Sequence, residues 1–329
     1  MILTKRARRI VAVLTVPAFL VGAAACGSDD SDSPSADEPV AAVSGEPGRP
    51  PEISVEGDAA FGEETVTDVL TEGDGAKVAE GDFVRLDVVG RVANADLELV
   101  NTWPDEGAEG DTPRQQYVVQ PGVESTLPQT ATESLVGKKV GSRVLVEGRV
   151  SEMLGAGAEQ AGIPADDGVV WVFDIAATAA VDPQGEAQGE QAATEEGLPE
   201  VEAPSGEPAT ITIPEGEDPP AELQEQVLIE GDGAEVEAGQ GLVAQYTGVL
   251  WDGGEKFDSS WDRGMASGFQ IGTGSVVQGW DQGLVGKHVG DRVLLVIPPD
   301  LGYGPEEQAG GAIPGDSTLV FVVDIVGTV

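Results

Sequence analysis

An internal repeat restricts the possible folds of this chain more than any other feature. Three pairs of segments match in the same order: Leu135–Val146 with Leu284–Leu295, Glu72–Ala76 with Glu230–Ala234, and Val170–Ile175 with Val320–Ile325. The matched segments lie roughly 150 residues apart, well beyond the period of a solenoid repeat. We therefore expect two tandem copies of one domain, over residues 52–179 and 210–329.

Each copy is predicted to consist mainly of strands. Gly241–Gly248 alternates apolar and polar residues, whereas Arg292–Ile297 and Thr318–Ile325 are nearly continuous apolar runs that suit buried strands. Gly279–Gly286 is the one short candidate helix. These patterns predict an α+β fold, in which a curved antiparallel sheet wraps over one short helix in each copy.

Two further segments are predicted to be linkers. Residues 26–51 are rich in Ser, Asp, Pro and Ala, and residues 180–209 contain eight acidic residues but no Lys or Arg. Such segments bury too little apolar surface to offset the loss of chain entropy. We expect a disordered acidic tether at 26–51 and an extended acidic Gly/Pro linker at 180–209.

Residues 1–25 are predicted to be a signal peptide. Basic residues Lys5 to Arg9 precede the apolar run Ile10–Val21, which is too short to cross a bilayer comfortably. Cys26, the single cysteine of the sequence, follows three alanines and resembles the lipidated cysteine of bacterial lipoproteins. The resemblance implies an extracytoplasmic protein that is anchored to the cytoplasmic membrane through a lipid on Cys26. The alternative is an ordinary signal peptide with a cysteine near its cleavage site.

The formal net charge of −42 excludes one class of partner. Nucleic-acid-binding proteins carry basic patches, so we expect no nucleic acid to bind. The acidic residues occur in runs and do not converge on one place, which favours solubility over cation capture. Adaptation to high salt is a further possibility. No metal site or cofactor is predicted.

Large aromatic side chains gather in the second copy. Eight of the 15 aromatic residues fall between Tyr246 and Phe321. Rings clustered around a few polar groups are typical of a small ligand-binding cleft. His288 has no recognisable catalytic partner and is expected to be exposed.

The second copy resembles the FKBP family of peptidyl-prolyl cis–trans isomerases over about residues 220–329. The resemblance rests on motifs that occur in order: Tyr246–Gly248, Phe257–Ser260, Val276–Trp280, Pro299–Gly304, Ile313–Pro314 and Thr318–Phe321. It implies a hydrophobic pocket with the Trp280 indole as its floor. The implied catalytic residues are Tyr246, Phe257, Asp258, Val276, Val277, Trp280, Tyr303 and Phe321, and the implied substrate-binding residues are Arg263, Phe269 and Ile313.

The reaction that the resemblance implies needs neither a nucleophile nor a metal. Rotation about an amide bond crosses a barrier of roughly 18–20 kcal/mol because resonance gives the C–N bond double-bond character. A dry pocket favours the twisted amide, and hydrogen bonds that fit only that geometry lower the barrier further. The Tyr303 hydroxyl and the Val277 N–H are the implied donors, and Asp258 is implied to be held by Tyr246 and Arg263.

Several positions depart from the family pattern. Ser267 stands where an aromatic wall residue is common, and Ala312 replaces a larger aliphatic residue. Both changes should open one side of the pocket, which puts substrate preference and macrolide affinity in doubt more than activity.

The first copy departs further. The positions of Tyr246, Phe257, Asp258, Trp280, Tyr303 and Phe321 fall on Val88, Leu99, Val100, Ala131, Leu154 and Trp171. We therefore expect a folded but inactive FKBP-like domain. Its role could be that of a spacer or of a chaperone surface.

The favoured interpretation is a lipid-anchored isomerase that assists proline-limited folding of exported polypeptides. Its expected partners are proline-containing unfolded or nascent chains, and macrolide inhibitors are possible ligands. Two alternatives use the same residues without turnover: a non-catalytic holdase, and a surface receptor for a proline-containing or macrolide ligand.

Overall fold

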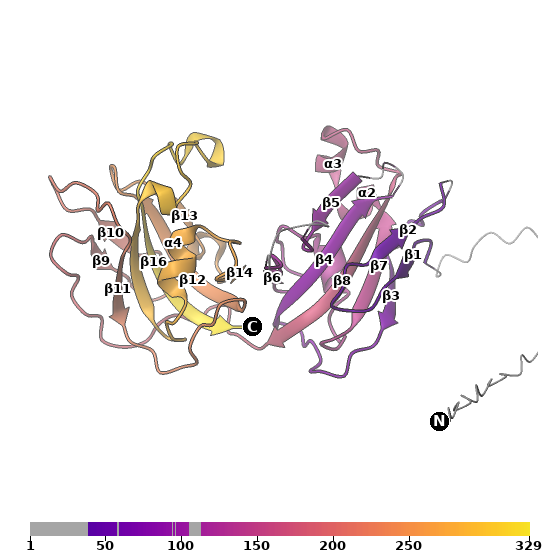
Figure 1. Cartoon of the computed structure of the whole chain (residues 1–329), viewed down its shortest axis with the longest axis horizontal. Coiled ribbons are helices and arrows are strands. Elements are labelled where there is room, and N and C mark those ends of the chain that lie inside the picture. The colour runs from indigo at the N-terminus through magenta and orange to yellow at the C-terminus, as the bar shows by residue number, and fades with distance from the viewer. Residues whose placement is uncertain (1–38, 58, 94, 96, 105–112) are drawn as a thin grey trace, which may run out of the picture. The chain divides into compact units, whose positions relative to one another are not determined.

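The computed structural model describes residues 39–57, 59–93, 95, 97–104 and 113–329, and these residues form two six-stranded antiparallel sheets (Figure 1). The predicted signal peptide and Cys26 lie outside the described residues. None of the helices in the described part of the chain is both long and apolar enough to cross a lipid bilayer.

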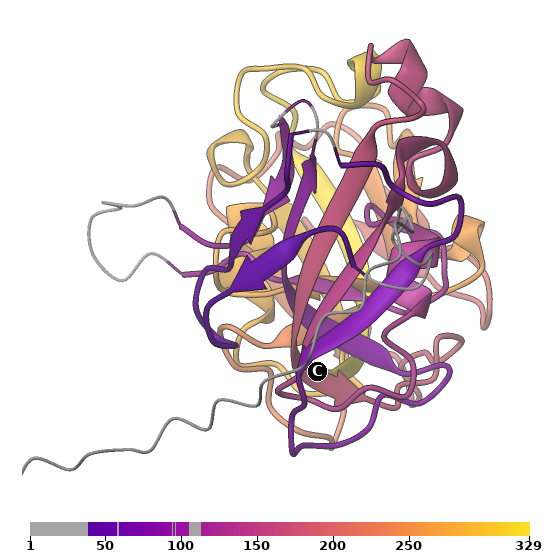
Figure 2. The same cartoon turned by 90° about the vertical axis from the view of Figure 1, so that its right-hand side faces the viewer.

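The first repeat runs from indigo to magenta in Figure 1, and in Figure 2 this repeat faces the viewer. Its strands follow the order β3-β7-β8-β4-β5, and β6 pairs with the free part of β4. The elements are β1 (Ala42–Ser44), β2 (Glu52–Ser54), β3 (Val66–Thr71), β4 (Phe83–Val92), β5 (Leu97–Asn101), β6 (Tyr117–Val119), α1 (Gln129–Glu133), β7 (Arg143–Arg149), α2 (Val150–Met153), α3 (Ala156–Gln160) and β8 (Gly168–Ala179).

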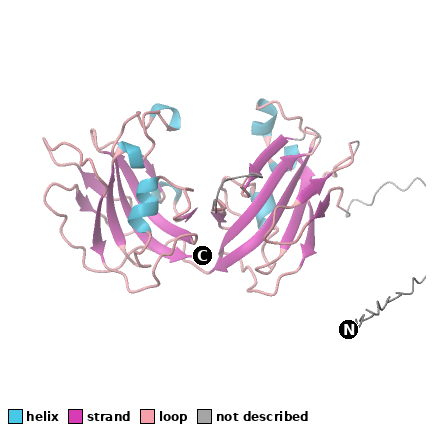
Figure 3. Cartoon of the chain, in the orientation of Figure 1, coloured by secondary structure: helices cyan, strands magenta, loops and turns pink. Residues whose placement is uncertain are grey.

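The second repeat has the same topology, β11-β15-β16-β12-β13 with β14 on β12, and its helices are short (Figure 3). This confirms the expected α+β fold. The elements are β9 (Glu200–Glu202), β10 (Thr210–Thr212), β11 (Gln224–Ile229), β12 (Gly241–Leu250), β13 (Lys256–Ser259), β14 (Ser267–Gln270), α4 (Gln278–Leu284), β15 (Arg292–Ile297) and β16 (Leu319–Thr328), with single 3₁₀ turns at Trp261–Arg263, Pro299–Leu301 and Ala309–Gly311.

The helix α4 lies close against one face of the second sheet, which we call the inner face (Figure 1). The opposite face of the sheet is its outer face. A methyl group added at Gly279 would come within 2.5 Å of Ile297, so glycine at this position allows the close approach. The helix then buries Trp280 and Leu284 against sheet residues such as Leu295. This packing fixes the place of Trp280 over the strands.

The outer face of each six-stranded sheet is covered by a short hairpin that precedes the sheet in sequence. In the second repeat, β9 and β10 pair with each other and place Val201 and Ile211 on the apolar outer face of the sheet. In the first repeat, β1 and β2 pair in the same way, and Ala41 and Phe61 cover the equivalent face. We call each covering segment a strap: residues 39–61 in the first repeat and 187–213 in the second.

The straps differ from the tether and linker that the sequence predicts for much of the same stretches. The acidic composition concealed a few apolar residues, such as Val201 and Ala187, that are buried in the structure. Each sheet presents apolar side chains on both faces. If the strap did not cover the outer face, residues such as Val296 and Val322 would be exposed to water, and their burial holds the strap in place.

A buried ion pair joins each strap to its sheet. In the second repeat, the Arg292 guanidinium donates to both oxygens of Asp324 at 2.6 and 2.7 Å, and Asp324 also accepts the backbone N–H of Ala187 at 3.0 Å. Arg292 further donates to the Gln191 side chain at 3.1 Å. The strap residues Ala187 and Gln191 therefore bind an arginine and an aspartate whose charges already neutralise each other within the sheet.

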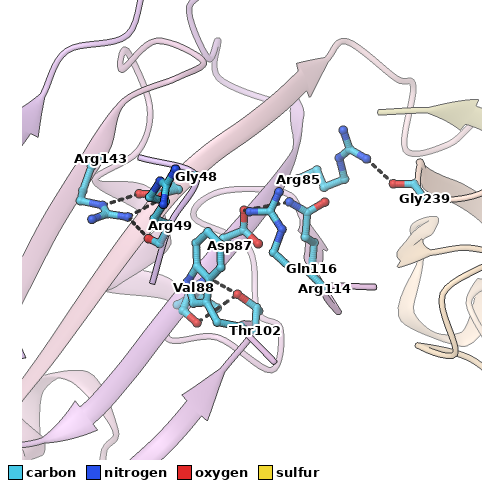
Figure 4. A network of polar contacts seen from close by, with 12 residues as sticks. Gly48, Arg49, Arg85, Asp87, Val88, Thr102, Arg114, Gln116, Arg143 and Gly239 are labelled. Atoms are coloured by element: carbon cyan, nitrogen blue, oxygen red, sulfur yellow. Dashed lines mark hydrogen bonds and ion pairs between the residues drawn. The ribbon is translucent and has the colours of Figure 1, made fainter. Parts of the chain in front are cut away.

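The first repeat contains the same arrangement (Figure 4). Arg143 binds Asp174 at 2.7 and 2.8 Å and donates to the carbonyl oxygens of Gly45 and Arg49 at 3.0 and 2.6 Å. Asp174 accepts the N–H of Gly48 at 2.8 Å. The recurrence shows that the strap is part of the repeated unit.

Replacing Arg292 with leucine should destabilise the second repeat strongly, because Asp324 would stay buried without its counter-charge. We expect the opening free energy of β15–β16 to fall by about 3–5 kcal/mol, measured by hydrogen–deuterium exchange of peptides from these strands.

Lys287→Leu is the matched control for Arg292→Leu. Lys287 pairs with Glu225 at 2.9 Å, but the Glu225 side chain is 43 % exposed. An exposed pair of this kind contributes about 1 kcal/mol at most. Equal losses in the two variants would contradict a clamping role for Arg292.

Candidate active site

A cavity of about 430 Å³ opens on the inner side of the second repeat. Its size lies within the range of small-ligand sites. Residues from β12, β13, β14, α4, β16 and the connecting loops line it: Tyr246, Phe257, Asp258, Phe269, Gly274, Ser275, Val276, Val277, Trp280, Tyr303 and Phe321. Nine of the predicted site residues therefore come together around one space.

Trp280 forms the apolar floor of this cavity. Its ring meets Tyr246, Phe269 and Phe321 edge-on, with ring centroids 5.4, 5.2 and 5.3 Å away. Phe257 contacts Phe321 in the same manner at 5.4 Å. Edge-to-face contacts of this kind are favourable and hold the rings in fixed orientations. The floor is therefore rigid before any ligand arrives.

The indole N–H of Trp280 is buried and has no hydrogen-bond partner in the described part of the chain. An unsatisfied buried donor costs free energy, and such groups concentrate at functional sites. This donor adds a polar element to an otherwise apolar floor.

One wall of the cavity carries a polar triad. Arg263 donates to Asp258 at 2.6 Å and to the Tyr246 hydroxyl oxygen at 2.7 Å, and the Tyr246 hydroxyl donates to Asp258. The Arg263 guanidinium also lies 5.6 Å from the centre of the Tyr246 ring. Asp258 and Tyr246 sit as the resemblance implied, whereas Arg263 supports this wall from behind and does not line the cavity.

Hydrogen bonds keep Asp258 ionised. Partial burial acts to raise the pKa of its carboxyl, but the hydrogen bonds from Tyr246 and Arg263 and the charge of Arg263 together lower that pKa below its ordinary value. Burial, followed by the hydrogen bond to Asp258, raises the pKa of the Tyr246 hydroxyl. At neutral pH the triad therefore consists of a carboxylate, a neutral phenol and a guanidinium.

Two hydrogen-bond donors lie at the edge of the cavity. Val277 directly precedes α4, and its carbonyl oxygen accepts the backbone N–H of Trp280 at 2.9 Å, while its own backbone N–H has no acceptor among the described residues. Tyr303 is 43 % exposed at the rim, and burial of its hydroxyl followed by the charge of Asp258 raises its pKa. Both groups are free to donate to a bound molecule.

The remaining predicted residues occupy different places. Ile313 is 4 % exposed, belongs to the same core cluster as Trp280 and does not line the cavity. Ser267 does not line the cavity and contacts Arg263 at 3.3 Å. His288 is exposed, as expected. Gly274 and Ser275 line the cavity but were not predicted, although their position directly before Val276 was a usable signal.

The corresponding region of the first repeat is filled by core side chains. The strand register places Trp171 opposite Gly90, as Phe321 lies opposite Gly248. The Trp171 ring lies directly over Gly90, stacks at 6.2 Å on Phe173 and is 3 % exposed. The helix α1 carries Ala131 where α4 carries Trp280, so this repeat has no equivalent aromatic floor.

A separate polar cluster occurs in the first repeat (Figure 4). The buried Asp87 accepts from Arg114 and Gln116, both at 2.9 Å, and Arg114 lies 4.5 Å over the Trp103 ring. Burial raises the pKa of Asp87 in spite of these partners. One oxygen of its carboxylate has no partner in the described part of the chain.

The comparisons with known proteins point in one direction. Residues 233–326 match the family described as FKBP-type peptidyl-prolyl cis-trans isomerase. The chain is 44 % identical to an FK506-binding protein of Streptomyces anulatus over 128 residues, 39 % of this chain and 94 % of that protein. It is 57 % identical to FK506-binding protein 2B of Rhizopus delemar over 27 % of this chain and 42 % of that protein.

Two solved structures are also similar. AtFKBP13 is 35 % identical, with a TM-score of 0.31 over 34 % of this chain and 96 % of that one. FkpA from Escherichia coli is 38 % identical, with a TM-score of 0.29 over 32 % of this chain and 47 % of that one. The family assignment rests on the sequence relatives.

Replacing Asp258 with asparagine should destabilise the protein in a pH-dependent way. Because the folded pKa of Asp258 is lowered, its contribution is present above the unfolded pKa of about 3.9 and is lost as pH falls through the lower folded value. We expect the difference in the free energy of unfolding between wild type and Asp258→Asn to be largest at neutral pH and to vanish under strong acid. The measurement is urea unfolding of both proteins at a series of pH values.

Asp262→Asn is the control for this titration, because Asp262 pairs with the exposed Lys256 at 2.7 Å. It should change stability little at any pH. A stability difference for Asp258→Asn that does not depend on pH would show that the carboxylate charge is not what holds the triad.

Proposed function

This chain belongs to the FKBP-type peptidyl-prolyl cis–trans isomerases, and we propose that its isomerase activity resides in the Trp280 cavity and serves polypeptides exported across the cytoplasmic membrane. The observation that carries the assignment of the site is the cavity itself: nine of the predicted site residues surround one apolar space with donors at its rim. The family supplies the reaction, and the geometry indicates where it takes place.

The proposed mechanism is non-covalent. A proline ring stacks on the Trp280 indole between Tyr246, Phe257 and Phe321, where water is excluded. A twisted amide has lost its resonance and much of its polarity, so an apolar site stabilises it relative to the planar ground state. No bond to the substrate is made or broken.

The donors at the rim act on the peptide backbone. The Val277 N–H and the Tyr303 hydroxyl can bind carbonyl oxygens beside the proline and hold the chain while the amide turns. Donors that are fixed before the reaction stabilise the transition state without a cost of reorganisation. The Asp258 triad keeps the Tyr246 ring in place and so preserves the shape of the pocket.

The cavity is also proposed to accept macrolides. The relatives carry the name FK506-binding protein, and the apolar cavity offers an aromatic floor to an apolar ring. Competition between a macrolide and a prolyl peptide would test this.

The first repeat is proposed to be non-catalytic. Trp171 and Phe173 fill the place of the cavity, and Ala131 stands where an indole would be needed. The repeat keeps its sheet, strap and ion pair, so it is retained as a folded unit.

The location is proposed from the sequence. Residues 5–25 have the pattern of a signal peptide, and Cys26 stands at the position of a lipidated cysteine. A lipid on Cys26 would keep the protein at the outer face of the cytoplasmic membrane, where exported chains emerge unfolded.

Trp280→Ala in the full chain should abolish most prolyl isomerase activity, by at least tenfold in kcat/KM, because it removes the floor of the cavity. The measurement is a protease-coupled or refolding assay with a prolyl peptide. The cavity left behind should also lower stability by about 3–5 kcal/mol, so Tyr303→Phe, at the exposed rim, is included as a variant that leaves the core intact.

Trp171→Phe in the first repeat is the matched control and should leave kcat/KM unchanged. Full activity in Trp280→Ala, with the fold verified by circular dichroism, would show that the site lies elsewhere. Suppression of client aggregation without any isomerisation would favour a holdase.

Cys26→Ser tests the location. The wild-type chain, expressed in a bacterium with a lipoprotein pathway, should fractionate with membranes and incorporate labelled fatty acid, whereas Cys26→Ser should do neither. Membrane association that is unaffected by the substitution would contradict the lipid anchor.

A further inference from the structure

A second cleft lies on the second repeat, apart from the isomerase cavity. It has a volume of about 1040 Å³, and the two spaces share no lining residue. Three segments form its walls: residues 211–219 of the strap and its continuation, the turn 250–255 between β12 and β13, and the loop 314–318. Its volume exceeds that of the isomerase cavity and suits an extended ligand.

Prolines form much of the apolar part of this cleft. Ile213, Pro214, Pro219 and Pro314 contribute to its walls, and proline restricts the backbone. Trp251 also lines the cleft, is 6 % exposed, and its backbone N–H donates to Thr318 at 3.0 Å. A site whose walls are already fixed loses little entropy when a ligand binds.

The Trp251 indole N–H is an unused donor. It donates to no residue in the described part of the chain and, unlike the Trp280 indole N–H, it is not sealed from solvent, although the residue as a whole is only 6 % exposed. A donor that water can reach is also open to an acceptor on a bound molecule. An acceptor from a ligand in the cleft, such as a backbone carbonyl, would satisfy it.

All charged residues that line the cleft are acidic. Its lining includes four carboxylates and no Lys or Arg: Glu217, Asp252, Glu255 and Asp316. Within the described part of the chain, none of the four forms an ion pair. Positive φ angles at Gly253 (82°) and Gly254 (66°) allow the tight turn that presents Asp252 and Glu255.

The spacing of these carboxylates argues against a metal ion. Among the described residues, no group of three or more acidic, His or Cys side chains is close enough together to hold one. The carboxylates are spread along the cleft, and a metal ion requires oxygen ligands that converge within about 2.6 Å. Separate positive charges along an extended molecule match this arrangement better.

We propose that this cleft binds an extended polypeptide segment that carries lysine or arginine side chains. The basic side chains would pair with the four carboxylates, and the apolar residues between them would lie on Trp251 and the prolines. A backbone carbonyl of the segment would accept the Trp251 indole N–H. This function goes beyond isomerisation, because the cleft can hold a chain whether or not a proline occupies the other cavity.

The test is the binding of a fluorescein-labelled decapeptide of alternating lysine and leucine, without proline, to the full chain by fluorescence anisotropy in 0.15 M NaCl. The double variant Asp252→Asn/Glu255→Gln should weaken binding at least threefold, since it removes two of the four carboxylates. Both side chains are exposed, so the fold should be unaffected.

The matched control is Glu230→Gln/Asp232→Asn, which removes the same charge from exposed positions outside the cleft. This control is needed because a chain of formal net charge −42 attracts any cationic peptide. Control binding equal to wild type would support the cleft. Equal weakening in the two double variants would overturn the proposal, because attraction would then follow net charge alone.

Two further measurements separate this site from the isomerase cavity. A proline-containing isomerase substrate without basic residues should not displace the lysine–leucine peptide, and displacement would place that peptide in the Trp280 cavity. The cleft variant should retain full kcat/KM on that substrate, so a failure of the isomerase assignment and a failure of the cleft proposal give different results.

Discussion

Each repeat depends on a bidentate ion pair between an arginine of the fifth sheet strand in sequence, β7 or β15, and an aspartate of the last strand, β8 or β16. Arg292–Asp324 and Arg143–Asp174 are buried on the outer face of their sheets. Buried charges are tolerated only when they are paired and their remaining hydrogen-bonding capacity is used. The strap supplies that capacity through backbone groups at Gly45, Gly48 and Ala187.

The strap in turn makes the two-sided sheet possible. With one face covered by the strap hairpin and the other by a helix, the central strands β12 and β15 are buried along their whole length. A rigid sheet holds Tyr246 and Phe321 at fixed positions on β12 and β16, and α4 brings Trp280 against them. The strap also builds one wall of the acidic cleft. One ion pair per repeat thus supports both the isomerase cavity and the second cleft.

The two repeats show how one fold can keep its scaffold and lose its site. Register, strand order, strap and ion pair are the same in both. What differs is the set of side chains on the inner face, where Trp171 and Phe173 fill the space that the second repeat leaves open above Trp280. Because the scaffold is stabilised from the outer face, the inner face is free to change.

The sequence by itself determined the repeat, the α+β fold and most of the residues around the cavity. Alternating and continuous apolar runs fix which strands are buried, and the motifs from Tyr246 to Phe321 each place a residue at a known position on a strand or a turn. These are local signals, so they can be read without the fold. The sequence also pointed to the inactive first repeat, because substitutions such as Ala131 for an indole are evident from alignment of the two copies.

The place of the straps on the sheets and the existence of the acidic cleft emerge from the three-dimensional packing alone. Val201 and Ile211 lie in a stretch dominated by acidic residues, and local composition there favours disorder. Their burial depends on an apolar sheet face that is formed by strands far away in sequence, so no local pattern reveals it. Ile313 was expected at the substrate; it is buried in the same core cluster as Trp280 and does not itself line the cavity. The cleft likewise arises from three segments that come together only when the strap docks.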